Sequence, residues 1–254
     1  MIAKELSKTK AKEFKALVSK KERDLQGLFL VEGEKCVKDS LDSFKLKNLI
    51  CTKDWFERNQ EFEENWGNEI LLSDKRGIEI ISSLNTPPEV IAVFEKPVYL
   101  EKIPELDKNK FYLLLDEIQD PGNLGTIIRT SDWFGVYQIF ASKNTVDVYS
   151  PKVVQSTMGS LSRVKVLYLD LEELILKNRD IKLIGTILNG VPLDDAKVIK
   201  NGMILMGNEG RGISNDLKKY IDLPVTIPPV NPSNHPDSLN VGIATAIILS
   251  KLIS

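Results

Sequence analysis

Cysteine and histidine are scarce in this chain, which has two cysteines and one histidine among 254 residues. Cys36 and Cys51 do not form a CxxC pair, so the sequence predicts neither a zinc site nor a disulfide framework. We expect both thiols to be reduced and partly buried, as in an intracellular protein. His235 lies between Asn234 and Pro236 without a GxSxG motif elsewhere in the chain. A histidine-based catalytic triad is therefore disfavoured, and His235 is expected to be a surface loop residue.

Long apolar segments and a strong net charge are also missing. The longest apolar stretch, Val241–Leu249, is too short to span a bilayer. The N-terminus is charged from Lys4 onward and lacks the apolar core of a signal peptide. A net charge of -2, with 42% hydrophobic and 28% charged residues, is typical of soluble globular proteins. We expect a cytoplasmic protein with one large or two modest domains.

The charge is uneven, because residues 1–23 carry eight basic and three acidic side chains. One interpretation is a basic arm that reaches a phosphate backbone. The other is a solvated amphipathic helix. Its buried face would contain Leu6, Phe14, Leu17 and Val18. The sequence alone leaves both interpretations open.

Hydrophobic patterns divide the rest of the chain into a small α/β unit at 24–97, a linker at 98–110 and a larger segment at 111–254. In the first unit we expect strands near 28–31, 49–51, 70–72 and 90–94, with helices near 35–44 and 55–66. In the larger segment we expect strands at 111–115, 138–141, 164–167, 183–186, 203–206 and 223–227, and helices at 124–134, 151–160, 171–176, 214–219 and 240–253. Such alternation predicts an α/β fold with a mostly parallel sheet covered on both faces.

Three segments of the C-terminal half end in the same kind of loop, Leu113–Thr130, Ile204–Gly212 and Ile227–Leu249. Each begins with a short apolar run and then breaks into glycine, proline, asparagine or serine. Polar loops at the carboxyl ends of parallel strands are where an α/β domain builds a ligand site. We therefore expect these loops to meet and to hold one small molecule and one polar substrate.

Each loop has a structural and a functional interpretation. Asn123 stands where a helix N-cap is expected, and Arg129 on the same helix could make an anion site. Glu209 lies in a G-x-x-G-x-G stretch that matches neither a dinucleotide fold nor a P-loop. It could be a ligand group or the ion-pair partner of an arginine. Ser238 or Asn240 could simply cap a core helix.

As an ordered set, the loops resemble the three signature motifs of the SpoU (TrmH-like) RNA ribose 2'-O-methyltransferases of the SPOUT class. The matching stretches read PGNLGTIIRTSDWFG, MGNEGRGIS and the bipartite IP…SLNVGIATAI. The segment Ser156–Leu161 also looks like the family's intervening segment. The resemblance covers about 111–254, and a weaker one covers 24–97. There Phe29–Gly33 looks like the family's L30e-like RNA-binding domain.

This resemblance implies a trefoil-knotted domain that binds S-adenosylmethionine, needs no metal, and forms a homodimer partly through the C-terminal helix. It implies catalytic roles for Asn123, Arg129, Glu209, Ser238 and Asn240. It implies a donor cradle of Thr186, Met206, Gly207, Ile227 and Leu239. Because a guanidinium stays protonated, Arg129 is expected to hold a phosphate and stabilise a developing alkoxide. Glu209 is expected to fix the loops by pairing with an arginine.

Two departures from the family pattern concern the third loop. The stretch from Pro228 to Ser238 is longer than the family's compact turn and contains prolines at positions 229, 232 and 236. Gly242 replaces a small polar residue. Neither departure removes a matched residue, although the first could alter the rim of the donor pocket.

The leading functional expectation is an rRNA 2'-O-methyltransferase whose N-terminal domain selects the site, since RNA is recognised by shape and by 2'-hydroxyl contacts. A tRNA substrate is the near alternative, and an rRNA methyltransferase of drug resistance is a variant of the first. From a different class, the chain could be a non-catalytic RNA-binding or ribosome-assembly factor. A nucleotide-dependent dehydrogenase is disfavoured by the glycine spacing.

Overall fold

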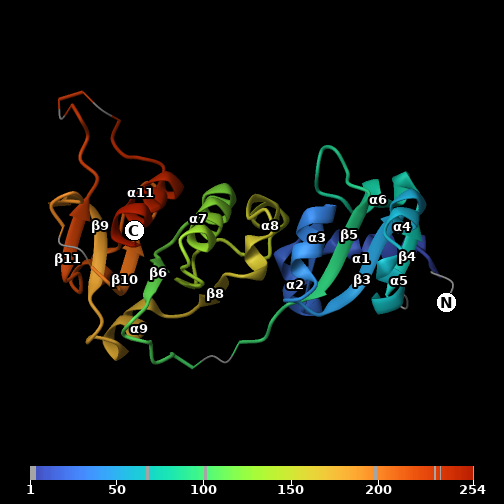
Figure 1. Cartoon of the computed structure of the whole chain (residues 1–254), viewed down its shortest axis with the longest axis horizontal. Helices are drawn as coiled ribbons and strands as arrows, with labels where there is room; N and C mark the ends of the chain where they lie inside the picture. Colours follow the sequence, from blue (N-terminus) through green and yellow to red (C-terminus); the bar gives the residue numbers. More distant parts are fainter. Residues whose placement is uncertain are drawn as a thin grey trace. The chain divides into compact units, whose positions relative to one another are not determined.

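The computed structural model describes residues 4–66, 69–99, 102–196, 199–231, 233–234 and 236–253. The chain forms two compact units (Figure 1). Unit 1 contains Met1–Val98 with Asp147–Ser162, and unit 2 contains Tyr99–Val146 with Arg163–Ser254. Among the described residues, no helix is long and apolar enough to cross a membrane. Pro232 and His235, for which the sequence analysis states expectations, lie outside the described residues.

Unit 1 is built on a five-stranded mixed sheet in the order β1-β4-β3-β5-β2. Its strands are β1 (Lys4–Glu5), β2 (Leu28–Glu32), β3 (Leu46–Thr52), β4 (Ile70–Ser73) and β5 (Val90–Glu95). Strands β1, β4 and β3 run parallel, whereas β5 pairs antiparallel with both β3 and β2. Its helices are α1 (Lys8–Ala16), α2 (Lys20–Gln26), α3 (Glu34–Ser40), α4 (Lys53–Arg58), α5 (Glu61–Trp66), α6 (Lys75–Ile81) and α8 (Pro151–Ser156).

The described part of the basic N-terminal segment is folded, and α1 is an amphipathic helix. The Ser7 side chain caps α1 by accepting a hydrogen bond from the Lys10 backbone N–H. Phe14 and Leu17 are buried, Leu6 packs against the same core, and the lysines of α1 lie mostly outside it. Val18 was expected on the buried face and is instead 40% exposed.

Residues 147–162 lie inside the predicted 111–254 domain, but they pack in unit 1. Asp147 accepts two hydrogen bonds from Arg23, at 3.0 Å from Nε and 2.6 Å from Nη2, and their side chains are only 10% and 3% exposed. The Tyr149 ring lies 4.7 Å from the Phe29 ring on β2. The remaining Arg23 donors satisfy two backbone carbonyls of the α1–α2 turn. Contacts far apart in sequence therefore build this region.

Unit 2 is built on a six-stranded sheet in the order β11-β9-β10-β6-β7-β8, and every neighbouring pair is parallel. The strands are β6 (Phe111–Leu115), β7 (Gln138–Ala141), β8 (Lys165–Tyr168), β9 (Leu183–Pro192), β10 (Gly202–Met206) and β11 (Leu223–Thr226). The helices are α7 (Pro121–Trp133), α9 (Leu171–Lys177), α10 (Asn215–Lys218) and α11 (Val241–Ile253), and a 3-10 turn, η1 (Ser160–Ser162), belongs to unit 1. The predicted α/β class with a parallel sheet is confirmed.

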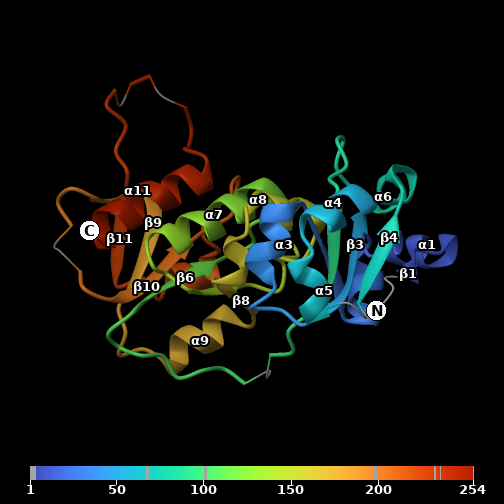
Figure 2. The ribbon, with the colours of Figure 1, turned by 45° about the vertical axis from the view of Figure 1, so that its right-hand side comes forward.

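Helices cover both faces of this sheet. Alternate strand residues, such as Leu114 and Leu205, pack with Leu174 of α9 in one apolar cluster. Figures 1 and 2 show α7 and α11 on the opposite face from α9. Glycine at position 242 allows α11 to approach α7, because a Cβ there would lie 2.9 Å from the Thr126 methyl carbon. This close approach gives a physical reason for the departure noted at Gly242.

Candidate active site

A cavity of about 590 Å³ opens at the carboxyl edge of the unit 2 sheet. All five residues predicted to cradle a methyl donor line it, namely Thr186, Met206, Gly207, Ile227 and Leu239. Thr186 lies within β9, Met206 and Gly207 lie at and just after the end of β10, and Ile227 and Leu239 lie between β11 and α11. The second and third loops therefore meet at one place, as expected for a parallel sheet.

The cavity has the chemistry of a nucleoside-type site. Its size lies within the range of small-molecule pockets, about 300–1,000 Å³. Apolar side chains such as Val225 and Ile248 line it together with residues of the loops after β10 and β11. The ionisable lining groups are Glu209, Arg211, Lys218 and Asp237. Apolar walls with a few polar groups fit S-adenosylmethionine, which combines an adenosine with a charged amino acid.

A hydrogen-bonded network joins the three motifs beside this cavity. The Asn123 side-chain amide donates to Glu209 Oε1 at 3.0 Å, and its Oδ1 accepts from Asn240 Nδ2 at 2.7 Å. We call these three residues the Glu209 network. Glu209 also accepts hydrogen bonds from the backbone N–H groups of Gln119 and Asp120, each at 3.3 Å. One carboxylate thus braces the first motif against the second.

The N-cap of α7 is Asp120 rather than Asn123. The Asp120 carboxylate accepts a hydrogen bond from the Asn123 backbone N–H at 2.8 Å, and Pro121 occupies the first turn. Because Asp120 satisfies this N–H, the Asn123 side chain is released for Glu209 and Asn240. The predicted capping role of Asn123 is therefore wrong, which leaves its functional interpretation.

Asn240 fulfils both interpretations of the third loop. Its Oδ1 accepts hydrogen bonds from the backbone N–H groups of Gly242 at 2.9 Å and Ile243 at 3.3 Å, as a cap of α11. Its Nδ2 simultaneously reaches Asn123. Ser238 lines the cavity and is exposed, but it is not one of the hydrogen-bonded partners of the Glu209 network.

Glu209 pairs with no arginine among the described residues, contrary to the expectation, and amide N–H groups bind it instead. The neighbouring Arg211 pairs with Glu117 instead, with Nη2 2.6 Å from Oε2. Arg129 is exposed on α7 and forms no hydrogen bond or ion pair with any other described residue. The described chain therefore does not bring Arg129 into the Glu209 network.

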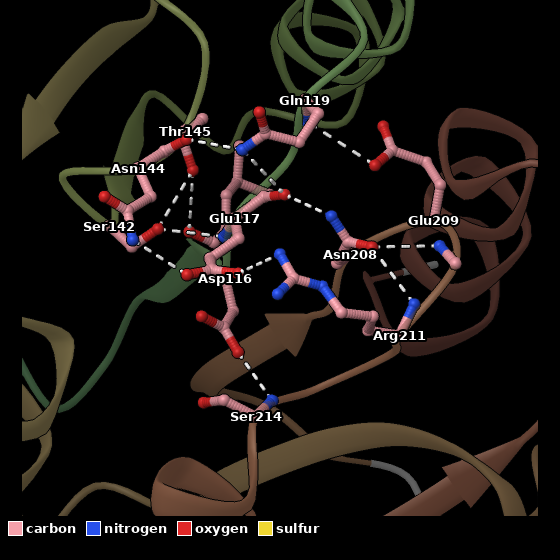
Figure 3. Close-up of polar contacts among 12 residues, drawn as sticks. Asp116, Glu117, Gln119, Ser142, Asn144, Thr145, Asn208, Glu209, Arg211 and Ser214 are labelled. Carbon is pink, nitrogen blue, oxygen red and sulfur yellow. Dashed lines mark hydrogen bonds and ion pairs between the residues drawn. The ribbon is translucent and has the colours of Figure 1, made fainter.

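Glu117 is a site residue that sequence reasoning missed (Figure 3). Its backbone N–H donates to Ser142 Oγ at 2.8 Å, and its carbonyl accepts from Asn208 Nδ2 at 2.8 Å. Its carboxylate accepts from Asn144 Nδ2 at 2.8 Å as well as from Arg211. The loops after β6, β7 and β10 are tied together at this residue. No sequence motif indicates Glu117, because its partners come from loops that lie far apart in the sequence.

The glycines of the second loop serve chain geometry as well as ligand access. A Cβ on Gly207 would lie 2.2 Å from the Ile213 backbone nitrogen, so only glycine allows this hairpin to close. Gly212 has a φ of 69°, a left-handed conformation that favours glycine. Asn208 and Gly212 form the bridge that closes the loop.

Comparison with known proteins places this geometry in one family. Residues 110–250 match the SpoU rRNA Methylase family, and residues 8–92 match the MRM3-like substrate binding domain. The chain is 32% identical to the 23S rRNA (guanosine(2553)-2'-O)-methyltransferase RlmP of Bacillus subtilis, over 96% of this chain and 95% of the relative.

Two solved structures have the same arrangement along almost their whole length. An AdoMet-bound rRNA methyltransferase from Sinorhizobium meliloti superposes with a TM-score of 0.86 at 31% identity, covering 98% of this chain and 96% of that one. The SpoU methyltransferase AviRb from Streptomyces viridochromogenes, in complex with AdoMet, gives a TM-score of 0.85 at 26% identity, with 97% of both chains covered. With the three motifs joined at Glu209, these matches show that the chain belongs to the SpoU rRNA methylase family.

Proposed function

We propose that this protein transfers the methyl group of S-adenosylmethionine to a ribose 2'-hydroxyl of ribosomal RNA. Family membership makes the chain an S-adenosylmethionine-dependent RNA 2'-O-methyltransferase. The observation that carries the proposal is that Glu209 takes part both in the cavity and in the hydrogen-bonded network. It lines the cavity that fits the donor, and it binds the Asn123 amide that joins the first and third motifs. In this proposal the donor and acceptor sites lie side by side.

The donor would be held mainly by backbone groups of Thr186, Met206, Gly207, Ile227 and Leu239, with apolar contacts around its adenine. When bound, it supplies an electrophilic methyl group on a sulfonium. The side of the cavity at Glu209 would remain open for the acceptor. Positioning of two reactants in line accounts for most of the catalysis that such a transfer needs.

The acceptor hydroxyl must lose its proton as it attacks, so the site must stabilise developing negative charge. The amides of Asn123 and Asn240 are fixed by each other and by Glu209, and are therefore preorganised to orient the ribose. Ser238, exposed at the cavity rim, is proposed to contact the acceptor nucleotide. Arg129 is proposed to hold a neighbouring phosphate and to stabilise the alkoxide, because its guanidinium stays protonated.

The substrate is proposed to be large-subunit rRNA. The relative RlmP is named as a methyltransferase of 23S rRNA and is matched along nearly the whole of both chains. Unit 1 would select the site, because most of it matches a substrate binding domain. A tRNA substrate is less well supported, because the chain matches the rRNA methyltransferase RlmP along unit 1 as well. The test below includes tRNA as the alternative substrate.

The finer assembly is also a proposal. We infer a trefoil knot in the C-terminal segment and a cytoplasmic homodimer in which α11 forms part of the interface. The support for the interface is that α11 is apolar nearly all round, with Ile243 on its outer side 54% exposed. A helix that is apolar on every face normally has a partner on every face.

The test measures methyl transfer from labelled S-adenosylmethionine to unmodified 23S rRNA, 16S rRNA and tRNA. The wild-type protein is compared with Asn123→Ala and Arg129→Ala, and Asn65→Ala is the matched control. Asn65 is an exposed asparagine of α5 whose amide, among the described residues, reaches only the Glu61 carbonyl one turn away. We expect label in alkali-resistant dinucleotides of 23S rRNA, strongly reduced in the first two variants only.

Other outcomes would change the conclusion. Label in tRNA alone would mean that the substrate is tRNA rather than rRNA. Label on a base would overturn the proposal that the ribose is methylated. Donor binding without transfer to free RNA would direct the assay to pre-ribosomal particles. An absence of donor binding in calorimetry would overturn the methyltransferase proposal and favour a non-catalytic RNA-binding factor.

A further inference from the structure

Arg211 is a fixed cation at the mouth of the donor cavity that none of the expected roles uses. Its side chain is 74% exposed although it is paired with Glu117. It lines the cavity together with Glu209, two residues before it in the chain. Among the described residues, only Glu117 binds its guanidinium, through Nη2. The other guanidinium N–H groups are therefore open to a second acceptor.

The backbone of Arg211 is held as firmly as its side chain. Its backbone N–H and that of Gly210 both donate to Asn208 Oδ1 at 3.0 Å. Asn208 and Gly212 bridge the loop by two backbone hydrogen bonds of 3.0 and 2.9 Å. Figure 3 shows Asn208 at the base of this turn, with Glu209 and Arg211 leaving it on either side. The turn thus sets where the guanidinium stands relative to Glu209.

Glu117 is itself anchored before it holds Arg211. It is a non-glycine residue with a φ of 57°, a conformation that costs about 1–3 kcal/mol and persists only where the surroundings impose it. Hydrogen bonds from Asn144 and Asn208, and one to Ser142, impose it here. An acidic residue held by the loops after β7 and β10 therefore fixes the guanidinium of an exposed arginine.

We propose that Arg211 binds a backbone phosphate of the RNA next to the acceptor ribose, and that Glu117 positions it for this contact. The inference rests on the proposed function and adds a recognition residue to it. RNA chains are polyanions, and a planar guanidinium is the side chain best suited to phosphate oxygens. A side chain that is already ordered loses less rotamer entropy on binding. This contact would be distinct from that of Arg129, which stands on α7.

The anionic group of the methyl donor is the other acceptor within reach of the cavity rim, and the experiment separates the two. Wild type, Arg211→Ala and Arg211→Lys are compared for three quantities. These are the KM of a 23S rRNA transcript, its filter-binding Kd between 50 and 200 mM KCl, and the calorimetric Kd of S-adenosylmethionine. Arg179→Ala is the matched control, because Arg179 is an exposed arginine paired with Asp222 in the same unit.

We expect Arg211→Ala to raise the KM for RNA by about tenfold, the equivalent of one charged hydrogen bond. The slope of log Kd against log salt should fall by about 0.7–0.9, which corresponds to one lost phosphate contact. The Kd of the donor should stay within about twofold of the wild-type value. Arg211→Lys keeps the positive charge but lacks the planar guanidinium, so its KM for RNA should lie between those of wild type and Arg211→Ala. Arg179→Ala should match wild type in all three quantities.

Two results would overturn the inference in a protein that transfers methyl groups normally. One is a weakened donor Kd with an unchanged KM for RNA, which would assign Arg211 to the donor. The other is an unchanged KM and salt slope in Arg211→Ala. A wild-type protein that binds RNA but transfers no methyl group would instead count against the proposed function. The salt slope still tests the phosphate contact in that case.

Discussion

A carboxylate braces loops in each unit, and the two carboxylates differ in their surroundings. In unit 1, Glu32 at the end of β2 is 4% exposed. It accepts hydrogen bonds from Ser82 Oγ at 2.5 Å, from Ser83 Oγ at 2.6 Å and from the Ser83 backbone N–H at 3.0 Å. Each of these partners is a short side chain or a backbone group of the same loop. Glu32 closes the loop after α6 onto the sheet.

In unit 2, Glu209 also accepts three hydrogen bonds, here from one side chain and two backbone N–H groups, but it is only half-buried and lines a cavity. Its side-chain partner, Asn123, passes a further hydrogen bond on to Asn240. We therefore propose that the same bracing chemistry is structural where solvent is excluded and functional where a cavity adjoins it. Burial, rather than residue type, separates the two roles.

The largest effect is expected at the buried ion pair of unit 1. Arg23→Ala leaves Asp147 buried without its main partner and should lower the free energy of unfolding by about 3–5 kcal/mol. Urea denaturation followed by the fluorescence of buried Trp55 would report it. Lys20→Ala is the control, because the Lys20–Asp24 pair is exposed and should contribute about 1 kcal/mol or less. Equal effects of both substitutions would contradict a structural role for the buried pair.

The next effect concerns activity. Glu209→Ala removes the brace between the first and second motifs and should lower kcat for methyl transfer by about 10²–10³-fold. Glu173→Ala, an exposed glutamate of α9 in the same unit, should leave kcat unchanged. Thermal unfolding of both variants should resemble that of wild type. A Glu209→Ala protein that keeps about a third of the wild-type kcat would contradict a functional role for Glu209.

Glu32→Gln should show the opposite pattern. The substitution keeps the shape but weakens hydrogen bonds to a charged acceptor, which lowers the free energy of unfolding by about 1.5–3 kcal/mol. Single-turnover methyl transfer by the folded protein should stay within about threefold of wild type. A loss of turnover larger than the loss of stability would mean that Glu32, too, acts on the substrate.

The smallest effect is expected at the cysteines, which are both buried. Burial raises the pKa of the Cys51 thiol to about 12 and also raises the pKa of the Cys36 thiol. Both thiols should therefore react slowly with a disulfide reagent at pH 8 and rapidly in urea. The raised pKa adds an alkaline destabilisation that grows from pH 9, the ordinary thiol value, to pH 12. Fast labelling of the native protein would contradict this burial.

Much of the fold followed from patterns along the chain. Alternating apolar runs located all six strands of unit 2, because buried parallel strands are apolar throughout. Boundaries set by pairing were missed. Strand β9 continues to Pro192, beyond the expected Thr186, because β11 pairs with it again at Val191. The single helix expected at 55–66 is split in two near Asn59, whose side chain bonds back to the Trp55 carbonyl.

The sequence by itself determined the class of fold, the three loops, and the residues Asn123, Glu209 and Asn240 that meet beside the cavity. Local periodicity indicates the fold class and the loops, and the resemblance of the three motifs to the family indicates the three residues. Only the tertiary structure decided which side chain caps α7, which acid holds Arg211, and that residues 147–162 pack in unit 1. Those outcomes depend on which donors and acceptors remain unsatisfied once distant segments are packed together. No local pattern encodes that competition.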